Sequence, residues 1–99
     1  MSAIISENKV LFKLGQVVAT PGAVRAMQEN GVEALSLLSR HANGDWGCVP
    51  EEDRLENQRS VEEGYRVMSS YVLNDRGDKL WVITEADRSS TCLLLPEEY

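Results

Sequence analysis

The residues with the clearest chemical potential begin in a polar segment at residues 40–47. It contains His41, the only histidine of the chain, followed by Gly-Asp-Trp-Gly. Imidazole has an unperturbed pKa close to neutrality, so a conventional proton transfer at pH 7 would start with His41, with Asp45 able to orient the ring. The alternative is structural. His41 then ends a helix and packs on Trp46, and Asp45 locks the loop by accepting main-chain hydrogen bonds.

A second polar segment, residues 84–91, is expected to join two adjacent strands. Thr84 and Thr91 should then face one another across the ladder while Arg88 projects from the tip. A guanidinium can hold phosphate or carboxylate through two parallel hydrogen bonds, which makes Arg66 and Arg88 candidates for binding an anion. An internal ion pair, for example of Arg88 with Asp87 or Asp45, explains them equally well.

Together these segments define one candidate site. Its catalytic positions are His41, Asp45 and Arg88, and its ligand-binding candidates are Arg40, Trp46, Arg66, Thr84, Glu85, Asp87 and Thr91. Trp46 and Trp81 could stack on a base, although both are expected in the core. The carboxylates form no recognised cation loop, and no phosphate loop, dinucleotide fingerprint or nucleophile elbow is present. We therefore predict no metal and no cofactor.

Composition narrows the class of protein. With 99 residues and 42% hydrophobic content, we expect a single domain over residues 1–99, with residues 1–9 as a candidate flexible segment. A domain of this size can gain stability by self-association, so a homodimer is an open option. A net charge of -6 argues against general nucleic-acid binding. With no membrane span, no secretory signal and two widely separated cysteines, the chain is expected to be cytoplasmic.

Periodicity predicts an α+β fold, because helices precede a run of strands. We expect an N-terminal strand within residues 10–20, bent near Gly15, and two or three short helices packed on a C-terminal antiparallel meander of three to four strands. The predicted helices are residues 20–30, 32–41 and 50–64, and the later strands lie within residues 65–73, 79–84 and 91–95. Ala23, Val24 and Met27 should share one helical face, and Ala34, Leu35 and Leu38 should form a buried stripe.

Several motifs together carry a resemblance to a known family. They are residues 19–23 (Ala-Thr-Pro-Gly-Ala), 40–47, 64–66 (Gly-Tyr-Arg), 69–71 (Ser-Ser-Tyr), 81–88 and 94–99. On these motifs the chain resembles small bacterial proteins labelled "plasmid-related protein" or, in some genomes, "type I restriction endonuclease subunit M". The match runs from Leu14 to Tyr99, and departs from the family where Thr91-Cys92 replaces Thr-Thr. The chain is too short for a methyltransferase domain, so the resemblance implies a context and no activity.

The leading expectation is a small accessory or binding protein of mobile-element or restriction-associated context. Both polar segments would form one surface for a protein partner or a small anionic ligand. A looser similarity is to the metal-independent ribonuclease toxins of the barnase and RelE type. That similarity implies His41 as acid and base, Arg66 and Arg88 on the phosphate, and Thr84 or Thr91 orienting it, with nucleic acid as partner only in this case. A third alternative is an acidic decoy of a nucleic-acid-binding enzyme.

Overall fold

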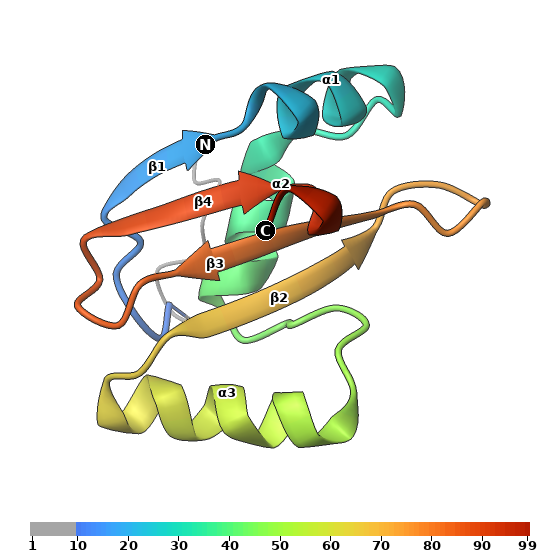
Figure 1. The fold of residues 1–99 in the computed structure, drawn as a ribbon. Coiled ribbons are helices and arrows are strands. Elements are labelled where there is room, and N and C mark those ends of the chain that lie inside the picture. The colour runs from blue at the N-terminus through green and yellow to red at the C-terminus, as the bar shows by residue number, and fades with distance from the viewer. Residues whose placement is uncertain (1–9) are drawn as a thin grey trace.

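A four-stranded sheet forms the centre of the computed structural model, which describes residues 10–99 (Figure 1). The strands are β1 (Gln16–Ala19), β2 (Val67–Val72), β3 (Lys79–Thr84) and β4 (Ser90–Leu94), in the order β1-β4-β3-β2. The last three form the predicted antiparallel meander, whereas β1 lies parallel to β4. The segment 1–9, expected to be flexible, lies outside the described residues.

The helices begin and end where local signals predict. Helix α1 (Pro21–Glu29) starts at Thr20, whose hydroxyl accepts a hydrogen bond from the Ala23 amide at 3.0 Å. Helix α2 is Ala34–Ala42, and α3 (Glu51–Glu63) ends at Gly64 in the left-handed conformation. A final turn of 3-10 helix, η2, covers Pro96–Glu98. None of the helices in residues 10–99 is long and apolar enough to cross a membrane.

The parallel pairing of β1 corrects the expectation of a purely antiparallel sheet. Residues 20–66 separate β1 from β2 and contain α1, α2 and α3, so β1 is not bound to a hairpin geometry and pairs with β4 in the parallel direction. The strand is also shorter than the extended segment predicted over residues 10–20. It begins only after Gly15, where a Cβ atom would lie 2.4 Å from the carbonyl oxygens of Arg88 and Ser89.

The two faces of the sheet have different surroundings. Helices α1 and α2 cover one face, the helix face, and their Met27 and Leu38 pack on Tyr71, Val82 and Leu93. The other, the open face, carries η2 in front of β3 and β4 (Figure 1). Part of the predicted buried helical stripes is wrong, because Val24 of α1 and Leu35 of α2 are 41% and 47% exposed.

Side chains and main chain from outside the sheet cover the β2 edge. Ser70 donates its N–H to the Trp46 carbonyl at 3.0 Å and accepts from the Cys48 amide at 2.8 Å. Two residues earlier in β2, Met68 contacts the buried Asn57 of α3, whose side chain donates to the Met68 carbonyl at 2.7 Å and accepts from the Met68 amide. These contacts fasten α3 to the sheet, although this helix is polar on most of its surface.

Gly47 allows the covering segment to approach β2, since its φ is +77° and a Cβ there would lie 2.0 Å from the Ser70 carbonyl oxygen. We expect Gly47→Ala to lower the free energy of unfolding by about 3 kcal/mol. The reasons are strain in the left-handed conformation and displacement of the segment from Ser70. Gly64→Ala is the matched control, because its φ is +82° with nothing within 4 Å. It should cost only about 1 kcal/mol. Urea denaturation measures both, and equal losses would contradict this explanation.

Candidate functional site

His41 lies at the centre of a buried chain of hydrogen bonds. Its Nδ1 is 2.6 Å from the Ser69 hydroxyl and its Nε2 is 2.9 Å from the Thr84 hydroxyl. Thr84 and Thr91 face one another as predicted, with their hydroxyl oxygens 2.6 Å apart. Thr91 donates to the Leu14 carbonyl at 2.7 Å. This buried relay therefore ties α2, β2, β3, β4 and the segment before β1 together.

The donors in the relay can be assigned in one direction only. Each hydroxyl has a single proton, and Thr91 gives its proton to Leu14. Thr84 must then donate to Thr91, so Nε2 of His41 carries the hydrogen and donates to Thr84. Nδ1 is left to accept from Ser69. Every group is satisfied with a neutral ring, and a second ring proton would meet the Ser69 hydroxyl proton.

Burial also opposes a charged His41. Its side chain has no exposed surface, and Phe12 and Trp46 lie edge-on to the ring at 5.2 and 6.0 Å. Loss of hydration, followed by the positive charge of Arg88, lowers the pKa of His41 to about 3. The predicted packing of His41 on Trp46 is confirmed. In this arrangement the imidazole cannot contact a substrate unless the elements covering it move.

Arg88 caps the C-terminal end of α3. Its guanidinium donates to the Ser60 and Tyr65 carbonyls at 2.9 and 2.7 Å, and to the Glu85 carbonyl at 3.1 Å. Helix α3 has no basic residue in its last turn, so Arg88 supplies the positive charge that the helix C-terminus favours. Within residues 10–99 Arg88 forms no ion pair with Asp87 or Asp45, and its guanidinium donates to main-chain carbonyls instead. It does not project from the loop tip.

Arg40 and Asp45 form the loop lock. The guanidinium donates to both carboxylate oxygens, at 2.7 and 3.3 Å, and lies 4.5 Å from the centroid of the Tyr71 ring. Asp45 also accepts from the Gly47 amide at 3.2 Å, the locking role that we predicted for it. The hydrogen bond from Arg40 lowers the pKa of Asp45. The carboxylate is therefore paired with Arg40 and not with His41.

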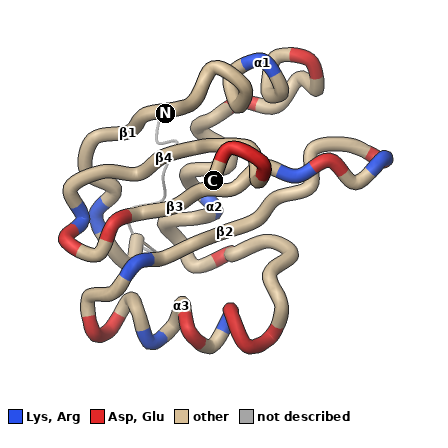
Figure 2. Tube along the Cα trace, in the orientation of Figure 1, with Lys and Arg blue, Asp and Glu red and all other residues tan. Residues whose placement is uncertain are grey.

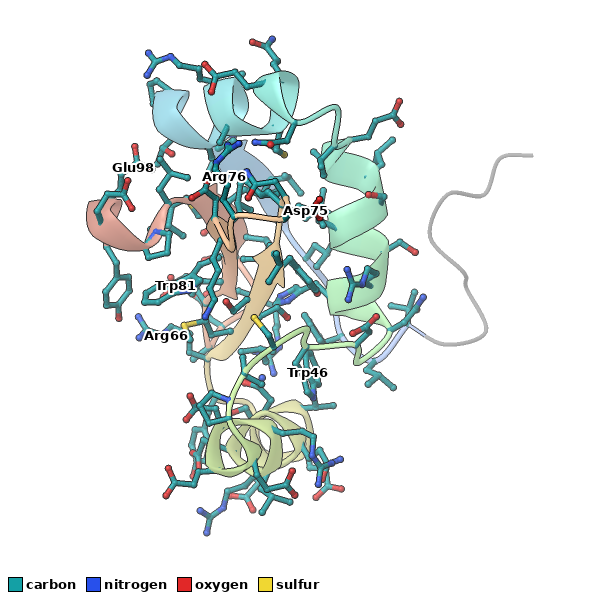
Figure 3. The ribbon with its side chains drawn as sticks, turned by 90° about the vertical axis from the view of Figure 1, so that its right-hand side faces the viewer. Trp46, Arg66, Asp75, Arg76, Trp81 and Glu98 are labelled. Atoms are coloured by element: carbon teal, nitrogen blue, oxygen red, sulfur yellow. The ribbon has the colours of Figure 1, made fainter. Side chains whose placement is uncertain are left out.

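Of the remaining candidates Trp46 packs on His41, whereas Arg66, Glu85 and Asp87 do not converge on it. Figure 3 places Arg66 and Trp81 on the side of the sheet toward η2, and Trp46 on the side toward α2. Arg66 donates to the Tyr99 hydroxyl, and Glu85 and Asp87 are exposed in the β3–β4 loop. The predicted site is thus divided between a buried relay, a loop lock, a helix cap and the open face.

The open face carries a different concavity, which we call the open-face trough. It consists of three neighbouring cavities of about 450, 330 and 170 Å³, of which the first lies at the end of the sheet between α1, the β2–β3 turn and η2. Lys79 and Pro96 line both the first and the second, and Asp53 and Met68 line both the second and the third. The three cavities are therefore neighbours in a row from α1 to α3.

The middle of the trough is mostly apolar, although Asp53 and Lys79 also line it, and both ends carry charged side chains. Met68, Trp81 and Pro96 line the middle cavity. Glu29 and Glu97 line one end, and Asp53 and Glu56 line the other. Sequence reasoning missed this surface because it treated Trp81 as a core residue and considered Met68 only as part of a strand. The available signal was the alternation of β2 and β3, which puts Met68 and Trp81 opposite the buried face.

The described residues form no metal site, and the comparisons with known proteins give no match. Within residues 10–99 no three His, Cys, Asp or Glu residues are grouped so that they could hold a metal ion. Comparison with family models, curated proteins and solved structures finds no match to the chain. The resemblance described in the sequence analysis stays a prediction.

The buried relay predicts acid sensitivity. Because the folded pKa of His41 lies below its ordinary value of 6.5, the unfolded chain binds the proton first as the pH falls. The stabilisation is present above pH 6.5 and decreases below it, by about 2 kcal/mol between pH 7 and pH 5. Urea denaturation at both pH values measures this change in the free energy of unfolding. The His41→Gln variant lacks the imidazole, so its loss between pH 7 and pH 5 should be smaller by about 2 kcal/mol. An equal pH dependence in both proteins, or an NMR titration of His41 near 6.5, would contradict the assignment.

Proposed function

We propose that this chain is a small accessory binding protein without catalysis of its own, and that it holds an extended segment of a partner protein in the open-face trough. The single observation that carries the proposal is the row of three neighbouring cavities from α1 to α3. Clefts with an apolar floor and a few polar groups are the usual form of binding sites, and 330 Å³ for the middle cavity is enough for a large side chain.

The internal use of the polar segments supports a binding role over an enzyme. His41, Thr84 and Thr91 are fully buried and hydrogen-bonded to one another or to the main chain. Arg88 donates to three carbonyls. A surface made of the two loops, as expected from the sequence, would have to use groups that already stabilise the fold.

The charges of the trough favour a particular partner chemistry. Acidic side chains line both ends of the trough, and the whole chain has a net charge of -6. Three basic residues also line it: Arg76 is paired with Asp78, Arg66 donates to Tyr99, and Lys79 lines the first and second cavities. The segment that fits is an apolar or aromatic side chain flanked by basic residues. The mobile-element or restriction-associated context rests on the sequence resemblance alone.

Two alternatives are less well supported. A ribonuclease would need an accessible acid and base and free arginines, whereas His41 is buried and Arg88 is engaged. A decoy would need a continuous acidic face. Figure 2 shows the acidic residues distributed over α3, η2 and several loops, with basic residues between them.

The binding proposal is tested by NMR titration of the full chain with two blocked peptides, Lys-Leu-Trp-Leu-Lys and Glu-Leu-Trp-Leu-Glu. We expect the basic peptide to shift the amide signals of Met68, Lys79 and Trp81 and to bind at least about fivefold more tightly than the acidic one. Trp81→Ala should weaken binding by about tenfold or more, because it removes the largest apolar side chain of the trough.

Tyr65→Ala is the matched control. Tyr65 is 50% exposed, lines none of the three cavities, and binds Arg88 only through its main-chain carbonyl. The Tyr65→Ala variant should bind the basic peptide as tightly as the unmodified chain does. The proposal is wrong if neither peptide shifts signals of the trough, or if the shifts lie on the helix face.

The ribonuclease alternative makes a separate prediction. We expect the unmodified chain to leave single-stranded RNA intact, and His41→Ala and Arg88→Ala to be equally inactive, because both residues are held inside the fold. Gel analysis of a labelled RNA is the measurement. Cleavage that disappears in either folded variant would establish the ribonuclease and remove the binding proposal as the primary function.

A further inference from the structure

The two edges of the sheet differ in how their main-chain groups are used. The β2 edge is covered by Asn57 and by the segment around Gly47. At the other edge, β1 has a neighbouring strand on one side only within residues 10–99. Gln16 donates its N–H to the carbonyl of Ser89, directly before β4, and Thr20 donates to the Leu93 carbonyl of β4, both at 3.0 Å. Because alternate residues of a strand direct these groups to opposite edges, Val17 and Ala19 present theirs away from β4.

The side chains of β1 leave this edge unprotected. Val17 and Val18 point to opposite faces and are 43% and 44% exposed. Gln16–Ala19 contains no charge and no proline, the residues with which soluble proteins commonly block an open edge. Figure 2 shows β1 without acidic or basic positions along its length.

We propose that β1 is a self-association edge, which pairs antiparallel with β1 of a second copy about a twofold axis at Val18. In this register Val17 of each copy lies opposite Ala19 of the other, and each pair exchanges N–H···O bonds in both directions. Val18 faces Val18 across the junction on the open face, where directly opposed side chains interact most closely. The two sheets become one continuous sheet.

The second copy is the occupant that the structure favours, because the contact closes on itself. Both partners use the same strand, and the edges that remain are the two covered β2 edges. Assembly therefore stops at a dimer and does not continue into a filament. Two copies that each carry a net charge of -6 repel one another, and the uncharged segment Gln16–Ala19 adds nothing to that repulsion.

Sedimentation of the full chain between about 10 μM and about 1 mM tests the proposal. We expect the mass to rise with concentration from 11.0 kDa toward twice that value. Val18→Lys should weaken dimerisation by about tenfold or more, since it places like charges directly opposite each other. Val17→Pro should do the same, because it removes an N–H that points away from β4. Amide exchange at Val17 and Ala19 should slow as the concentration rises.

Leu55→Lys is the matched control. Leu55 is 52% exposed on α3, which packs against the β2 edge, so it adds the same charge away from β1 and should leave the dimer unchanged. Circular dichroism establishes that each variant is folded. A mass that stays at 11.0 kDa up to about 1 mM overturns the proposal. A dimer that Val18→Lys and Val17→Pro leave intact overturns it equally, because the contact would then lie elsewhere.

Discussion

The neutral, buried imidazole of His41 is the constraint on which much of the structure depends. Its two nitrogens connect α2 to β2 and β3, and the threonine pair extends the connection to β4 and Leu14. A buried polar chain of this kind is favourable only when every donor has an acceptor, which specifies how the helix sits on the sheet. The histidine therefore serves to position elements, and its burial, followed by the charge of Arg88, lowers its pKa.

The arginines of the two polar segments have a similar structural role. Arg88 supplies the positive charge missing from the last turn of α3, and Arg40 pairs with Asp45 while stacking on Tyr71. Each of these contacts joins segments that are distant in the chain or holds a loop closed. A high density of polar residues in loops can thus reflect the hydrogen bonds that a small domain needs to hold its elements together.

Helices α1 and α2 cover the helix face, so we place the proposed recognition on the open face. It carries the trough that we propose for a partner segment, and β1 forms one border of the same sheet. In the proposed dimer the twofold axis is perpendicular to the sheet, so both troughs would face the same direction. Two linked sites on one side would bind a partner with repeated segments more tightly than either site alone.

The sequence by itself determined the local features: the start of α1 at Thr20, the end of α3 at Gly64 and the three antiparallel strands. It also predicted that Thr84 faces Thr91, because hairpin register follows from the chain between them. Only the tertiary structure decided the parallel pairing of β1, the choice of Ser69 as the partner of His41, the capping by Arg88 and the open-face trough. Periodicity and capping act over a few residues, whereas these contacts join segments tens of residues apart. Their geometry exists only after the whole chain has packed.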